Sequence, residues 1–440
     1  MNRRFQSLWE SLHTSFWFLP TLMAAVAIGL AYGIVRLDRS VSWDGRAIRA
    51  FFYPGGPEGA RLVLSTIAGS TITVAGVTFS ITIAALTMAS SQFGPRMLRS
   101  FLADKGNQIV LGTFVATFIY CLLVLRTIRD VDIGTFVPEI AVTFGLALAL
   151  VSFGVLIYFF HHASSSIQAE QVVETVYSEL VDAMHATFPE KQESIPGPSP
   201  ESSPPGPGDE SAVVPALTSG YLKAVDDRGL VSVAVEQDLI VRLQYRPGQF
   251  VFEQTRLATV TGQRRANTDV HRKIRKACVT GAYRSLEQDV EFPIQQLVDM
   301  ALRALSPSLN DPYTAVNCID RLGAAICRLN SLEPARSHHY DRQGNLRLVR
   351  PVPTYESVLD SAFGPIRRGA ARNFTAAVRL LEALSGIAVT SRSERQREAL
   401  RRHVEMVHHL CREASAEPRD RDLMESRYQA VIRALDKRME

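Results

Sequence analysis

The chain has 440 residues, of which 48 are Lys or Arg and 44 are Asp or Glu, leaving a net charge of only +4. Because the basic residues are interleaved with acidic ones, the composition excludes the strongly basic surface typical of nucleic-acid-binding proteins. The five cysteines form no CxxC pair and no metal-ligand spacing, which argues against a disulfide framework and an oxidising compartment.

Hydropathy divides the chain near residue 160, with mostly apolar sequence before that point and densely charged sequence after it. A helix needs about 20 apolar residues to cross the hydrocarbon core of a bilayer. Four segments meet this requirement, at about residues 16–35, 62–91, 108–125 and 140–160. We therefore predict a membrane domain of four transmembrane helices over residues 1–163.

The second predicted span carries small and hydroxylated residues at a spacing of seven. Two turns of helix are close to seven residues, so the members of the row share one face. One set with this spacing is Thr66, Thr73, Ser80 and Thr87, and a second set follows three residues later with Gly69, Gly76 and Ile83. The two sets share one face, and we refer to the seven residues together as the row. Such a face either packs closely against neighbouring helices of the same domain or lines a pore, with Ile83 as a hydrophobic constriction.

A short basic segment separates the second and third spans and contains Arg96, Arg99 and Lys105. At the mouth of a pore, these side chains would favour anions. The lack of an acidic ring within the second span argues against a filter for divalent cations. The basic segment and the cysteine usage favour placing both ends of the four-span domain in the cytoplasm.

After the fourth span, residues 164–188 have the spacing of an amphipathic connecting helix, and residues 189–212 form a Pro-rich linker. Residues 213–262 change to a strand pattern, with strands expected at 221–224, 231–235, 239–243 and 250–260. The pattern is that of a small β barrel-like subdomain, but the turn at 236–238 has no Lys and so excludes a carrier role. Residues 263–440 are predicted to be mainly helical, with a hairpin at 338–349. The fold class is thus a membrane α-helical domain followed by a soluble α+β domain.

The most distinctive soluble motif is ALRALSPSLNDPYTAVNCIDRL, at residues 301–322. Asp311 followed by Pro312 is a strong helix start, and Ser306 before Pro307 ends the preceding helix. One interpretation is a capped turn between two core helices. The other is a polar pocket or oligomer contact formed by Arg303, Asn310, Asp311, Thr314 and Arg321.

Histidines occur in adjacent pairs, at residues 161–162, 338–339 and 408–409. Neighbouring residues on a helix point about 100° apart, so a pair alone chelates a metal poorly. We therefore predict no metal site and no cofactor. His161 and His162, at the end of the fourth span, are placed to sense pH. No nucleotide-binding or catalytic motif is present, and an enzyme is not expected.

Three segments resemble one bacterial family of predicted inner-membrane proteins, catalogued as domain of unknown function 2254. They are the 301–322 motif, the basic segment SSQFGPRMLRSFL and the span NQIVLGTFVATFIYCLLVLRTIR. The resemblance extends over nearly the whole chain, with the Pro-rich linker as the departure. It implies the architecture and carries no established activity.

Three functional hypotheses follow. The first is an oligomeric inner-membrane channel in which the second span lines the axis and the soluble domain assembles or gates it. The second is a membrane-anchored sensor or scaffold whose soluble domain binds a ligand or partner. The third is a membrane enzyme using Asn310 and Asp311. The expected partners are the lipid bilayer, further copies of the chain and ions, but not nucleic acid.

Overall fold

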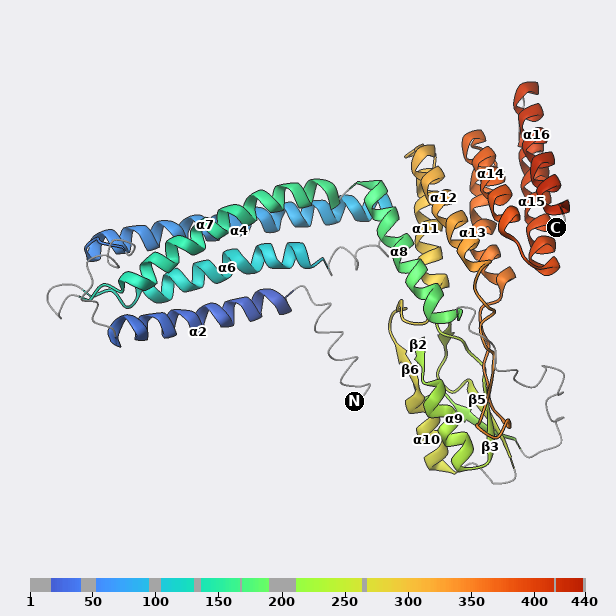
Figure 1. Cartoon of the computed structure of the whole chain (residues 1–440), viewed down its shortest axis with the longest axis horizontal. Helices are drawn as coiled ribbons and strands as arrows, with labels where there is room; N and C mark the ends of the chain where they lie inside the picture. Colours follow the sequence, from blue (N-terminus) through green and yellow to red (C-terminus); the bar gives the residue numbers. More distant parts are fainter. Residues whose placement is uncertain are drawn as a thin grey trace. The chain divides into compact units, whose positions relative to one another are not determined.

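The computed structural model describes residues 17–40, 53–94, 104–129, 136–166, 168–189, 211–262, 267–414 and 417–437. The chain divides into two compact units, Met1–Gln171 and Val172–Glu440. In Figure 1 the first unit runs from blue to green and the second from green to red. Most of the predicted linker, residues 190–210, lies outside the described residues.

Within the described residues of the first unit, four helices are long and apolar enough to cross a membrane. They are α2 (Phe18–Ser40), α4 (Pro57–Phe93), α6 (Lys105–Leu125) and α7 (Glu139–Ser166). Each coincides with one predicted span, so the four-helix prediction is confirmed. At 1.5 Å per residue, the 37 residues of α4 extend over about 55 Å, more than the hydrocarbon core requires.

Helix α6 is central to this unit, since it contacts α2, α4 and α7. Its Tyr120 is fully buried and donates its hydroxyl to the carbonyl of Ala141, at 2.9 Å. The hydroxyls of Thr117 and Ser152 pair at 3.1 Å between α6 and α7. These bonds satisfy polar groups that a bilayer would leave without water.

Carboxylates hold the ends of the spans. Asp38, near the end of α2, accepts from the amides of Ile140 and Ala141 at 3.1 and 3.0 Å. The start of α7 is therefore fixed against α2. Asp104 caps α6 through the Gly106 amide at 2.8 Å and contacts His162 Nε2 at 2.5 Å. One carboxylate thus joins the start of α6 to the end of α7.

The described part of the second unit contains eight strands in two sheets. They are β1 (Ser211–Pro215), β2 (Gly220–Val225), β3 (Leu239–Leu243), β4 (Phe250–Val251), β5 (Arg256–Gly262), β6 (Cys278–Gly281), β7 (His338–Tyr340) and β8 (Leu346–Val349). One sheet has the order β1-β5-β3-β8-β7 and the other β4-β2-β6. The strands thus lie in two separate sheets, and the barrel-like arrangement is not confirmed. Strands from beyond residue 262 complete both sheets.

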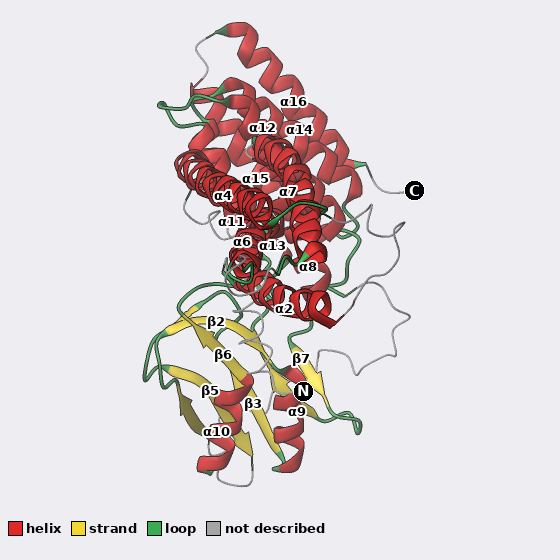
Figure 2. Cartoon of the chain, turned by 90° about the vertical axis from the view of Figure 1, so that its left-hand side faces the viewer, coloured by secondary structure: helices red, strands yellow, loops and turns green. Residues whose placement is uncertain are grey.

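The expected strand at 231–235 is wrong, because these residues belong to helix α9 (Asp227–Glu236). The Asp226 side chain caps this helix by accepting from the Gly229 amide at 3.3 Å. Leu230, Val233 and Ala234 are buried at the i, i+3, i+4 spacing of a helix face. Figure 2 shows α9 beside α10 (Thr268–Ala277), against the strands.

The expected strand at 250–260 is interrupted as well. It forms β4 and β5, separated by a turn in which Gln254 has a positive φ of 61°. The left-handed conformation cannot continue a strand, which explains the break. The hairpin at 338–349 is confirmed as β7 and β8, which pair antiparallel.

The remaining elements of the second unit are helical. They are α8 (Ala169–Thr187), α11 (Glu291–Ala304), α12 (Pro312–Leu329), α13 (Tyr355–Ala370), α14 (Phe374–Thr390), α15 (Glu394–Ala414) and α16 (Pro418–Asp436). Their apolar faces pack pairwise, as in the contacts of α12 with α14 and of α14 with α16. The helical prediction for the C-terminal part is confirmed.

Candidate functional site

Helix α4 has two different faces. Its buried face, which packs in the helix bundle, consists of Ala60, Leu64, Ala68, Thr71, Ala75, Thr78, Ala89 and Phe93. The predicted small and hydroxylated row lies on nearly the opposite side, because each residue turns the helix by 100°. All seven members of the row are exposed in the single chain. The row is therefore not used for packing among the four helices of one chain.

Every hydroxyl of the row is bonded within α4. Thr73 Oγ1 donates to the Gly69 carbonyl at 2.8 Å, and Ser80 Oγ donates to the Gly76 carbonyl at 2.9 Å. Thr66 and Thr87 donate in the same way to the carbonyls four residues earlier. Since the hydrogens are used inside the helix, the oxygens present only lone pairs to the surroundings.

The glycines of the row leave backbone open. A Cβ atom built on Gly69 or Gly76 would meet nothing within 4 Å. By contrast, a Cβ on Gly112 of α6 would lie 2.5 Å from the sulfur of Met23 and 3.2 Å from the Cα of Pro20. Glycine at 112 is thus required by packing inside the unit, whereas glycine at 69 and 76 is not.

Other exposed parts of the spans look different. Helix α7 exposes large apolar side chains, including Leu150 at 75%, Phe153 at 63% and Ile157 at 59%. Such residues are the ones that lipid tails favour. The small, hydroxylated row on α4 instead has the composition of a helix–helix contact or a wetted surface.

The predicted basic mouth can be placed only in part. Arg96 and Arg99 lie outside the described residues. Lys105 is exposed at the first position of α6, directly after the capping Asp104.

The corner between α11 and α12 is a capped turn. The Asp311 carboxylate accepts from the Thr314 amide at 3.1 Å and also from the Thr314 hydroxyl. Asn310 has a positive φ of 45°, which closes the tight turn. Pro312 occupies the first turn of α12. The sequence interpretation of a helix start at Asp311 is confirmed.

The structure does not bring Arg321 to Asp311. Arg321 lies ten residues further along α12, about 15 Å away. It pairs with Glu174 of α8 at 2.7 Å and lies over the ring of Tyr177. Arg303 is half-buried near the end of α11. Arg321 therefore ties α12 to α8 instead of completing a pocket at the corner.

The C-terminal histidines are bound separately. His403 is buried, with its Nε2 2.8 Å from Asp360, while His408 contacts Glu425 at 2.8 Å. Among the residues that the structure describes, no three His, Cys, Asp or Glu side chains gather as a metal ion would require.

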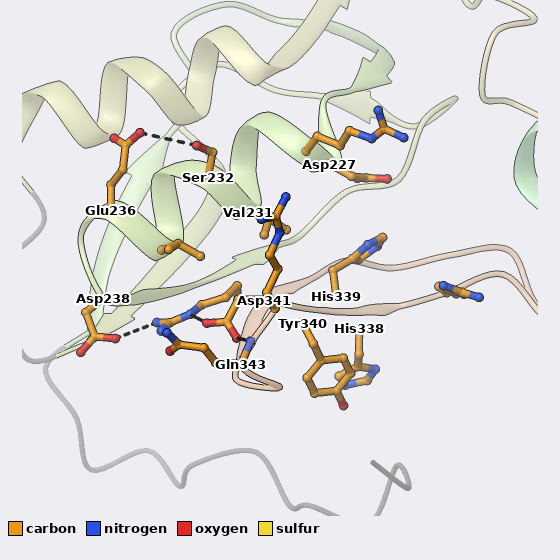
Figure 3. A pocket seen from close by; sticks show the side chains of 15 residues that line it. Asp227, Val231, Ser232, Glu236, Asp238, His338, His339, Tyr340, Asp341 and Gln343 are labelled. Atoms are coloured by element: carbon orange, nitrogen blue, oxygen red, sulfur yellow. Dashed lines mark hydrogen bonds and ion pairs between the residues drawn. The ribbon is translucent and has the colours of Figure 1, made fainter. Parts of the chain in front are cut away.

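A cavity that the sequence did not predict lies between α9 and the β7–β8 hairpin, with a volume of about 1290 Å³. Figure 3 shows this cavity from close by. Several basic side chains line it, including Arg228, Arg336 and Arg342. The spacing of basic residues in ARSHHYDRQGNLRLVR, residues 335–350, was a signal for a basic hairpin. The position of the β7–β8 hairpin next to α9 could not be inferred, because it depends on contacts between residues far apart in the sequence.

These features define a multi-span membrane protein with a soluble α+β unit. The chain belongs to the family described as "Predicted membrane protein (DUF2254)", whose model matches residues 13–386. It is similar to uncharacterized proteins of Mycobacterium bovis (Mb1321c) and Mycobacterium tuberculosis (Rv1290c). Each is 33% identical over 435 residues, which cover 96% of this chain and 81% of the relative. No solved structure matches the chain.

Proposed function

We propose that the protein is an oligomeric channel of the bacterial inner membrane, assembled through the hydroxylated face of α4. The observation that carries this proposal is the outward position of the row, opposite the face that packs in the bundle. A surface of small residues lets helix backbones approach closely between chains. Symmetric association would then bring copies of α4 around one axis.

In such an assembly, each hydroxyl of the row contributes to a ring around the axis. Thr66, Thr73 and Ser80 would supply successive rings of oxygen lone pairs, which stabilise water and permeating ions. Ile83, 48% exposed in the single chain, would form a hydrophobic constriction. No Asp or Glu occurs between Gly59 and Phe93, so the proposed path has no carboxylate filter for divalent cations.

The second unit is proposed to lie in the cytoplasm, where it assembles or gates the channel. All five cysteines are free thiols, which suits a reducing compartment. The Asp311 corner is proposed to be structural instead of catalytic, since its carboxylate is engaged as a helix cap.

The proposal is tested by ion flux through purified protein reconstituted in liposomes, comparing the wild type with Ser80→Leu. A leucine at each copy would narrow the path and remove one ring of oxygens, so flux should fall at least severalfold. The matched control is Ser164→Leu, because Ser164 of α7 is also exposed and also donates to the carbonyl four residues earlier, at 2.8 Å.

If the wild type conducts and both variants conduct equally well, α4 does not line the conducting path. If the wild type itself conducts nothing across a range of membrane potentials and pH values, the channel proposal fails.

A further inference from the structure

The cavity between α9 and the β7–β8 hairpin has a rigid wall. Arg347 of β8 is buried, and its Nε donates to Asp341 at 2.8 Å, while its Nη1 donates to Asp238 at 2.7 Å. Asp341 also accepts from the amides of Gln343 and Asn345 at 2.9 Å. The turn of the hairpin is thereby fixed to the segment that follows α9, and the cavity is preformed (Figure 3).

The carboxylates that line the cavity already have basic partners. Asp238 and Asp341 share Arg347. Asp227 faces Arg350 at 3.2 Å, and Glu236 contacts Lys273 at 3.1 Å. Each acidic group of the cavity thus has a basic partner, although the four carboxylates share three cations and one negative charge is left over.

Three further guanidinium groups line the same cavity, those of Arg228, Arg336 and Arg342. All three residues are exposed, and their side chains form no ion pair within the described part of the chain. The cavity thus carries an excess of positive charge. All three are arginines, whose planar donors match the oxygens of phosphate groups.

His339 supplies an independent observation. It lines the cavity and extends from β7 toward α9, whereas His338 and Tyr340 extend from the other side of the hairpin (Figure 3). Its Nε2 has no hydrogen-bond partner among the described residues and is shielded from solvent. Buried polar atoms are usually paired, so a ligand in the cavity would gain a hydrogen bond from this atom if the imidazole ring turned toward it.

Part of the remaining lining is apolar. Val231 and Val235 lie one turn apart on α9 and face the cavity. Val235 is 45% exposed, which is high for a large apolar side chain on a helix that packs against a sheet. A ligand with both an anionic and an apolar part would match both kinds of lining.

We propose that this cavity binds an organic phosphate of the nucleotide class. Its phosphates would pair with Arg228, Arg336 and Arg342, and its ring would contact Val231 and Val235. The inference concerns the second unit alone and holds whether or not α4 lines a channel.

The test is equilibrium binding of ATP to the full-length protein in detergent, with inorganic tripolyphosphate as a second probe. We expect saturable binding of ATP that Arg336→Gln and Arg228→Gln each weaken about tenfold or more, because each removes charge-assisted hydrogen bonds. Arg372→Gln is the control, since Arg372 is an exposed arginine between α13 and α14, outside the cavity. It should leave the affinity within twofold. Tripolyphosphate should compete, but bind more weakly than ATP.

No saturable ATP binding, or an equal loss in all three variants, would overturn the proposal. The same holds if vesicles of phosphatidylglycerol bind with a dependence on Arg336 while ATP does not, because the phosphate would then belong to a lipid headgroup. These readouts involve no ion flux, so their failure is distinguishable from a failure of the channel proposal.

Discussion

Two histidines in the second unit, the buried His403 and the half-buried His339, have their pKa values lowered, chiefly because burial disfavours the charged imidazolium. His403 is only 1% exposed, and burial lowers its pKa although the neighbouring Asp360 acts in the opposite direction. Arg367 and Arg402 add to the lowering. The pKa of His339 is lowered by burial and by Arg350 and Arg336, against the opposing effect of Asp227.

These shifts predict that the protein loses stability on mild acidification. The unfolded chain has His pKa values near 6.5 and binds more protons than the folded chain as the pH falls below that value. The contribution of each neutral histidine to the free energy of unfolding is thus complete above about pH 6.5 and is lost toward lower pH. The loss is at most about 1.4 kcal/mol per pH unit for each histidine. Thermal unfolding of the full-length protein should therefore begin at lower temperature at pH 5.5 than at pH 7.5.

The variant His403→Gln should make that pH dependence shallower, at the expense of some stability at neutral pH. His409→Gln is the control, since His409 lies on the same helix but is exposed. An identical slope in the wild type and in His403→Gln would show that His403 does not contribute to it.

At the scale of single helices, two glycines of the first unit should respond differently to valine. Gly112→Val would push side-chain atoms into Met23 and the backbone of Pro20, so α2 and α6 must separate. We expect a loss of about 1–3 kcal/mol of stability, as for other overpacked positions. Gly76→Val has open space around it and should leave the fold of the single chain intact.

The same Gly76→Val variant should weaken association between chains, because valine would separate closely packed helices. Thermal stability and the oligomer size in mild detergent measure the two effects separately. A Gly76→Val protein of unchanged oligomer size would argue against α4 as the contact.

Much of the element structure could be predicted because it depends on local signals. Apolar length predicts the four spans, and the Asp311–Pro312 pair predicts the start of α12. The sequence predicts a strand in place of helix α9 because Val231, Val233 and Val235 alternate as in a strand. The helix forms because its first turn is capped and because Leu230 adds to a buried helical face. A pattern of β-branched residues only five residues long does not distinguish the two-residue period of a strand from the 3.6-residue period of a helix.

At the scale of the whole molecule, contacts between distant residues escape prediction. Arg347 and Asp238 are 109 positions apart, and their bond brings the hairpin to α9. Strand β8 joins β3 in parallel, which no local pattern specifies. The cavity depends on both contacts, so the sequence alone predicts its basic residues but not the cavity itself. Likewise, the hydroxylated row could be predicted, but which side of the bundle it faces could not.

The central claim, that α4 is the contact between chains, is tested most directly by cysteine cross-linking in membranes. Ser80→Cys and the control Ser164→Cys each place one thiol at an exposed serine, on α4 and α7 respectively. Four native cysteines are buried, and the half-buried Cys327 is present in both variants, so any cross-link through it would appear in both. Mild oxidation should link Ser80→Cys chains into dimers and leave Ser164→Cys chains monomeric on denaturing gels. Dimers from Ser164→Cys but not from Ser80→Cys would contradict the account.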